Sequence, residues 1–150
     1  MDLRDLIGKP GVLPTDPGRN KVLIVDDDIN LRMLMVRVLR RSGYECQPAS
    51  STQEAREHLR GAAFALVVTD MRMFAEDGIE LVRHVADRYP NTSSVVVTGL
   101  ALPEIEDQLR RAGASAVVAK PFDAAAFTGV VQETLEERDA TVELRRHQSA

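Results

Sequence analysis

Five short polar motifs each stand at or just past the end of an apolar run. They are Asp26-Asp27-Asp28, Asp70, Asp77-Gly78, Thr98-Gly99 and Lys120-Pro121-Phe122. If the apolar runs are parallel strands of one sheet, their carboxyl ends share an edge and the polar groups converge there. Carboxylates, a hydroxyl and an ammonium in one pocket suit a divalent cation and a phosphoryl group. The spacing therefore predicts a cation and phosphoryl site at this edge.

The acidic triplet is costly without a cation, because crowded carboxylates raise the free energy of each other's ionised form. A magnesium ion removes that cost and accepts oxygen ligands while it keeps some of its water. Asp26 and Asp27 fall at the strand end, and we expect Asp28 to face solvent or to begin the next helix. The alternative is an acidic loop with a helix N-cap, since Asp is favoured in both places.

Asp70 ends a run that should be buried on both faces, where a carboxylate is expensive unless it is paired or bound to metal. Aspartate can attack phosphorus to form an acyl phosphate. The plainer interpretation is a strand-end residue that caps the following loop.

Lys120 precedes Pro121, which favours extended geometry and aims the ammonium at the same crevice. There it could hold a phosphate oxygen or pair with Asp70, although a surface lysine remains the alternative. Thr98 could donate its hydroxyl to a phosphoryl oxygen. By itself, Thr98 is explained equally well as a β-branched packing residue.

Strands and helices are predicted to alternate five times. The expected strands are Lys21–Val25, Tyr44–Pro48, Phe64–Thr69, Ser94–Thr98 and Ala116–Ala119. The expected helices are Ile29–Ser42, a helix opened by Ser51, Ile79–Arg88, Pro103–Ala112 and a helix that begins at Asp123. Apolar strands that alternate with helices predict an α/β fold: a doubly wound five-stranded parallel sheet of order 2-1-3-4-5, flavodoxin-like.

The 150 residues fit one domain, which we place at 21–138. We expect residues 1–20, rich in Gly and Pro, to form a flexible N-terminal arm, with a short helical turn at Leu3–Ile7. We expect residues 139–150 to form a frayed tail or a connector helix, which leaves a homodimer possible.

Bulk properties exclude several classes of protein. A single cysteine fits a reducing compartment, and the acidic start is not a signal peptide, so we expect a cytoplasmic protein. No apolar run approaches membrane-spanning length. The net charge of −4, the scattered basic residues and the absence of Trp argue against direct nucleic-acid binding.

From about Lys21 to Glu137 the chain resembles the receiver domain of two-component response regulators. The matching segments are Val22–Asp28, Val67–Gly78, Val95–Gly99 and Ala112 through Phe122. The resemblance implies that a histidine kinase or phosphotransfer protein donates a phosphoryl group to Asp70. It implies that Mg²⁺ is held by Asp26, Asp27, Asp70 and the backbone carbonyl of Arg72, with Thr98 and Lys120 on the phosphoryl oxygens. Such a domain is no enzyme beyond its own phosphorylation and dephosphorylation, and it acts on a downstream protein partner or a fused output domain.

Three positions depart from the pattern of that family. Phe74 stands where a proline is common, so we expect a looser loop after Asp70 or a Phe74 that packs against a partner. Val117 stands where many members carry an aromatic switch residue, so a rotating aromatic cannot report activation here. Arg72 replaces a small polar residue, and we expect its side chain to screen an acyl phosphate from water.

Two alternatives stay open. A haloacid-dehalogenase-type phosphatase also uses an Asp nucleophile at a strand end, but the segment after Asp26-Asp27-Asp28 does not fit that pattern. A degenerate receiver that only binds partners, without phosphorylation, is kept open by Phe74 and Val117.

Overall fold

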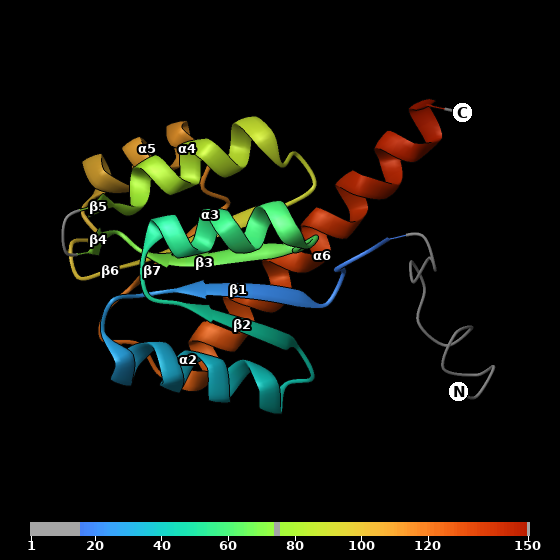
Figure 1. Ribbon diagram of the computed structural model, residues 1–150. Helices are drawn as coiled ribbons and strands as arrows, with labels where there is room; N and C mark the ends of the chain where they lie inside the picture. Colours follow the sequence, from blue (N-terminus) through green and yellow to red (C-terminus); the bar gives the residue numbers. More distant parts are fainter. Residues whose placement is uncertain (1–15, 74–75, 150) are drawn as a thin grey trace.

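The structure is a computed structural model, and it describes residues 16–73 and 76–149. Its main sheet holds five parallel strands: β1 (Lys21–Val25), β2 (Glu45–Ala49), β3 (Leu66–Asp70), β6 (Ser93–Thr98) and β7 (Ala116–Ala119). Their order is β2-β1-β3-β6-β7 (Figure 1). Once the two short hairpin strands β4 and β5 are set aside, this is the predicted order 2-1-3-4-5. The predicted fold is confirmed.

Five helices connect and cover the strands. They are α2 (Ile29–Arg41), α3 (Thr52–Gly61), α4 (Gly78–Arg88), α5 (Pro103–Ala112) and α6 (Ala124–Ser149). Four of them begin at a polar side chain that accepts a backbone N–H, namely Asp28 before α2, Ser51 before α3, Asp77 before α4 and Asp123 before α6. These caps satisfy N–H groups that a helix start would otherwise leave without a partner.

The helices lie in two layers, with α3, α4 and α5 on one face of the sheet and α2 and α6 on the other (Figure 1). Side chains of a strand alternate between these layers. In β1, Val22 and Ile24 pack with α2 and α6, whereas Leu23 and Val25 pack toward α3 and α4. Because both faces are covered, every residue of β3 is buried.

The helical spacing places Leu34 with the other apolar residues of α2, but this residue is 48% exposed. The stripe that packs on the sheet is made by the buried residues Met35, Val36 and Leu39, with Leu31 and Val38 partly buried beside them. Leu34 lies at the margin of that stripe, where helical periodicity alone does not separate a core position from a flanking one.

The segment after Asp70 is a small antiparallel hairpin, in which β4 (Arg72–Met73) pairs with β5 (Glu76–Asp77). The looser loop that we expected from the missing proline falls between these two strands and stays a prediction. Phe74 itself, like the proposed turn at Leu3–Ile7, lies outside the described residues.

Helix α6 continues without a break across residue 139, where we placed the start of a frayed tail or a connector helix. Arg138 explains part of this continuity. Its buried guanidinium forms two hydrogen bonds with the carboxylate of Asp16 and one ion pair with Asp139. Its Nε also donates to the Asn91 carbonyl. The described part of the predicted arm, residues 16–20, is thereby held against α6 by Asp16, and Arg19 pairs with Asp139 as well. Within the described ranges, no helix has the length and apolar character needed to span a bilayer.

Candidate functional site

Strand register alone brings the predicted site residues to one edge. Val25 is the partner of Thr69 and Val97 is the partner of Asp70, so Asp26 and Thr98 follow on either side of the β3 end. Thr98 is in turn the partner of Ala119, the residue before Lys120. Four adjacent strand ends therefore deliver the triplet, the central acid, the hydroxyl and the amine to one place.

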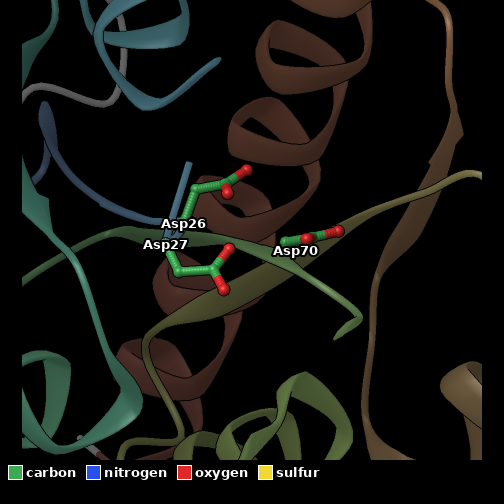
Figure 2. A group of neighbouring side chains, drawn as sticks. All are labelled: Asp26, Asp27 and Asp70. Atoms are coloured by element: carbon green, nitrogen blue, oxygen red, sulfur yellow. The ribbon is translucent and has the colours of Figure 1, made fainter. Parts of the chain in front are cut away.

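Three carboxylates form the acidic half of the site. One oxygen each from Asp26, Asp27 and Asp70 lie within 4.8 Å of one another. Figure 2 shows Asp26 and Asp27 side by side, with Asp70 across from them on the neighbouring strand. Asp26 is fully buried, Asp70 is nearly so, and Asp27 reaches solvent.

Of these acids, Asp26 has the least favourable environment for a negative charge. Its Oδ1 accepts the backbone N–H of Asp28 at 2.9 Å, but its Oδ2 is buried without a hydrogen-bond partner among the described residues. Burial raises the pKa of Asp26 to about 6, and the negative charge of Asp70 pushes it in the same direction. The protein on its own therefore leaves this carboxylate undersatisfied.

That deficit fits a divalent cation. Mg²⁺ takes carboxylate oxygens together with water, and one exposed and two buried acids leave a solvent-facing side for those waters. A cation here would supply a partner for the buried Asp26 oxygen and would reverse the cost of placing three acids together. The donor set therefore matches the predicted metal.

Lys120 supplies the positive half of the site. Its Nζ donates to Asp70 Oδ1 at 2.9 Å, in an ion pair whose carboxylate is largely shielded from water. The peptide bond between Lys120 and Pro121 is cis. The Lys120 N–H also donates to the Thr98 carbonyl, which fixes the residue at the end of β7. The pairing of Lys120 with Asp70 agrees with the expectation from the sequence.

Thr98 lies at the same edge and is buried, but its hydroxyl is weakly engaged. Its Oγ1 accepts the backbone N–H of Leu100 at 3.0 Å and lies 3.8 Å from Met71 Sδ. A thioether is a poor acceptor, so little is lost if this hydroxyl donates elsewhere.

Gly78 is required by the packing beneath the site. A Cβ at this position would stand 2.1 Å from the Asp70 carbonyl oxygen, so no other residue fits without a shift of the backbone. The Gly78 N–H donates to the Met71 carbonyl, while Asp77 caps α4 through the Ile79 N–H at 3.0 Å. The Asp77-Gly78 motif therefore supports the strand end that carries Asp70 rather than adding a ligand.

Arg32 was missed by the sequence reasoning. Its Nη1 donates to the Asp26 carbonyl at 2.8 Å and so ties α2 to the end of β1. An arginine one turn into an amphipathic helix looks like any surface arginine, and no sequence signal distinguishes it. Arg72 lies exposed in β4, while Val117 packs against the core cluster that includes Val82 of α4 and Leu109 of α5.

The family model described as the response regulator receiver domain matches residues 22–132. This chain belongs to that family. The response regulator PilR of Pseudomonas aeruginosa is 33% identical over 125 residues, which are 83% of this chain and 28% of PilR. The receiver protein CpdR of Brucella abortus is 29% identical over 102 residues, which are 68% of this chain and 85% of CpdR.

The fold comparison agrees with the sequence comparison. A CheY-like response regulator receiver domain from Methanospirillum hungatei superimposes with a TM-score of 0.77 at 27% identity, over 81% of this chain and 98% of that one. Receiver domains are signalling modules rather than enzymes, histidine kinases phosphorylate them, and they bind Mg²⁺ at an acidic pocket. The receiver assignment leaves no support for the phosphatase alternative.

Proposed function

We propose that this receiver domain accepts a phosphoryl group on Asp70 from the phosphohistidine of a kinase or phosphotransfer protein. The ion pair between Lys120 and Asp70 carries the proposal, because it places the amine of the Lys120-Pro121-Phe122 motif on Asp70 within the cluster of three acids. Asp26, by contrast, accepts the backbone N–H of Asp28 through one oxygen, and its other oxygen is buried without a hydrogen-bond partner among the described residues.

The chemistry is a transfer between two nucleophiles. An oxygen of Asp70 forms a bond to phosphorus, the phosphorus–nitrogen bond to the donor imidazole breaks, and the imidazole leaves with its electron pair and takes up a proton. Asp26, Asp27, Asp70 and the Arg72 carbonyl would hold Mg²⁺. When bound, Mg²⁺ neutralises the charge of the acids and of the phosphoryl oxygens.

Lys120 and Thr98 have complementary tasks. The Lys120 ammonium already contacts Asp70 Oδ1, so it would meet a phosphoryl oxygen with only a small movement. The Thr98 hydroxyl would exchange a weak contact with sulfur for a charged oxygen. We propose this exchange as the local event that distinguishes the phosphorylated from the unphosphorylated domain, since Val117 offers no aromatic ring that could rotate.

The wider role follows from the family. We propose that phosphorylation changes affinity for a downstream protein or for an output domain, and that the protein acts in the cytoplasm. That the chain forms a homodimer stays a prediction. The same holds for the boundaries of the arm (1–20), the receiver domain (21–138) and the tail or connector helix (139–150). A degenerate domain that works without phosphorylation is the competing account, and a single experiment separates the two.

The experiment is incubation with acetyl phosphate and Mg²⁺, followed by intact mass measurement. We expect one added phosphoryl group that requires the metal and is lost in Asp70→Asn. Asp28→Asn is the matched control, because Asp28 belongs to the same acidic triplet but serves as the N-cap of α2, and this variant should still gain the mass. A mass gain that persists in Asp70→Asn would refute the assignment, and no gain in the wild type would favour the degenerate alternative.

A further inference from the structure

A second hollow lies at the opposite end of the sheet from Asp70. It has a volume of about 540 Å³ and is formed by the carboxyl ends of α3 and α4, the segment that leads into β6, and α6. Figure 1 shows these helix ends gathered beside the projecting half of α6, away from the carboxyl ends of β1 and β3. Its apolar wall includes Leu59, Ala62, Phe64 and Pro90. The volume falls within the range of small-molecule sites.

The lining of this hollow is strongly cationic. Four arginines contribute to it, namely Arg60, Arg88, Arg138 and Arg146, against a single acid, Asp16. Asp16 is already committed to Arg138 in a two-pronged ion pair. Within residues 16–73 and 76–149, Arg60 and Arg88 form no ion pair. The basic residues that look scattered in the sequence are therefore brought together here by three separate helices.

The excess of positive charge extends along the seam between α3 and α4. His84 faces this seam, and its pKa is lowered first by burial and then by the charges of Arg56, Arg88 and Arg60, against which Asp87 acts in the opposite direction. Arg56 Nε is buried and has no hydrogen-bond partner among the described residues. The protein thus leaves several guanidinium groups of one surface without anionic partners.

Helix dipoles explain only part of this pattern. Arginine in a last turn stabilises the negative end of its own helix, and Arg60, Arg88 and Arg146 all hold such positions. That effect acts on each helix separately, however, and does not require the three side chains to share one hollow. Arg60 and Arg88 have no ion-pair partner within residues 16–73 and 76–149, and the convergence of their like charges is unfavourable unless an anion joins them.

We propose that this hollow binds a small phosphate-bearing molecule, with its phosphate groups between Arg60 and Arg88 and its less polar part on the wall around Leu59 and Phe64. Guanidinium groups recognise phosphate through paired hydrogen bonds. A phosphate carries up to two negative charges, whereas a single carboxylate would leave most of the local positive charge unbalanced. This site is separate from the phosphoacceptor site and does not depend on it.

The test is isothermal titration calorimetry on the full chain in buffer with EDTA, so that no metal can recruit phosphate to the acidic pocket. The probes are ADP, pyrophosphate and adenosine. We expect saturable binding of ADP and pyrophosphate but not of adenosine. Arg60→Gln and Arg88→Gln should each weaken this binding about tenfold, as expected for the loss of one charged hydrogen-bonding group.

Two variants serve as controls. Arg83→Gln removes an arginine from the same helix α4, but that side chain is exposed and pairs with Glu80, so the affinity should not change. Asp70→Asn should also bind normally, which separates this site from the phosphoacceptor.

Several results would overturn the proposal. One is the absence of saturable binding of either phosphate probe at concentrations up to about 1 mM. Another is an equal loss of affinity in Arg83→Gln and Arg88→Gln, which would mean that bulk charge alone attracts the anion. A third is tighter, Arg88-dependent binding of a hexaglutamate peptide, which would assign the surface to an acidic protein segment.

Discussion

At the carboxyl end of the sheet, Asp26 is buried beside two further acids, and one of its oxygens has no hydrogen-bond partner in the part of the chain that the structure describes. At the amino end, the equally buried Arg138 meets Asp16, Asp139 and the Asn91 carbonyl. Arg138 is thus a buried charge that its surroundings satisfy, and Asp26 is one that they do not. An unsatisfied buried charge costs stability and persists where a ligand supplies the missing partner. The difference supports the proposed site at the carboxyl end and a structural role for Arg138 as a clamp.

Removal of the satisfied charge, that of Arg138, should have the largest effect on the free energy of unfolding. In Arg138→Met, Asp16 and the Asn91 carbonyl lose their buried partner, and we expect the free energy of unfolding to fall by about 3–5 kcal/mol. Arg145→Met is the matched control on the same helix, because Arg145 is exposed and should cost less than about 1 kcal/mol. Urea unfolding followed by circular dichroism measures both. Equal losses in the two variants would contradict the clamp.

Removal of the unsatisfied charge, that of Asp26, should raise the free energy of unfolding rather than lower it. The pKa of Asp26 rises from 3.8 to about 6 in the folded state, so the folded protein binds this proton more tightly than the unfolded chain does. The ionised form of Asp26 therefore penalises folding above pH 6, and the penalty disappears as the pH falls toward 4. One pKa unit is about 1.4 kcal/mol, so the penalty at pH 7 is on the order of 3 kcal/mol.

Asp26→Asn should consequently be more stable than the wild type at pH 7 in metal-free buffer, by up to that amount. The gain should shrink as the pH is lowered through 6 and should be nearly absent at pH 4. Mg²⁺ should raise the melting temperature of the wild type at pH 7.5 more than at pH 5, and should raise that of Asp26→Asn little. A variant that is less stable than the wild type at pH 7 without metal would contradict this account of the acidic end.

The smallest expected effect is that of replacing Arg72, at the acidic end of the sheet. Its side chain is exposed two residues after Asp70, where we expect it to shield the acyl phosphate from water. Arg72→Asn should shorten the lifetime of the phosphorylated domain a few-fold without a change in stability. The decay of the phosphorylated mass over time measures this, and Arg83→Gln is the control. A lifetime that is unchanged or longer would rule out the shielding role.

Much of the fold was predictable because its strands are continuous apolar runs with polar ends. The bounds of β1 and β7 match the prediction. Strand β2 begins at Glu45 and not at Tyr44, and so lies one residue later than predicted, because the sequence of this edge strand is less apolar. The hairpin of β4 and β5 could not be predicted, because two-residue strands carry no periodicity.

The site was predictable for a related reason. Parallel strands fix where their carboxyl ends lie, so Asp70 and Lys120, 50 positions apart in the chain, could be placed together from strand order alone. No such rule connects Asp16 with Arg138, which are 122 positions apart and meet through a turn and a helix face. The clamp and the cationic hollow depend on helix ends, whose relative positions the sequence pattern does not specify.

The most direct test of the central claim is to locate the phosphoryl group on the chain. Borohydride converts an aspartyl phosphate to homoserine, and peptide mass spectrometry then reports the modified position. After treatment with acetyl phosphate and Mg²⁺, we predict homoserine at position 70 and at neither position 26 nor position 27. Homoserine at one of the other two acids, or at none of the three, would contradict the assignment of Asp70 as the acceptor.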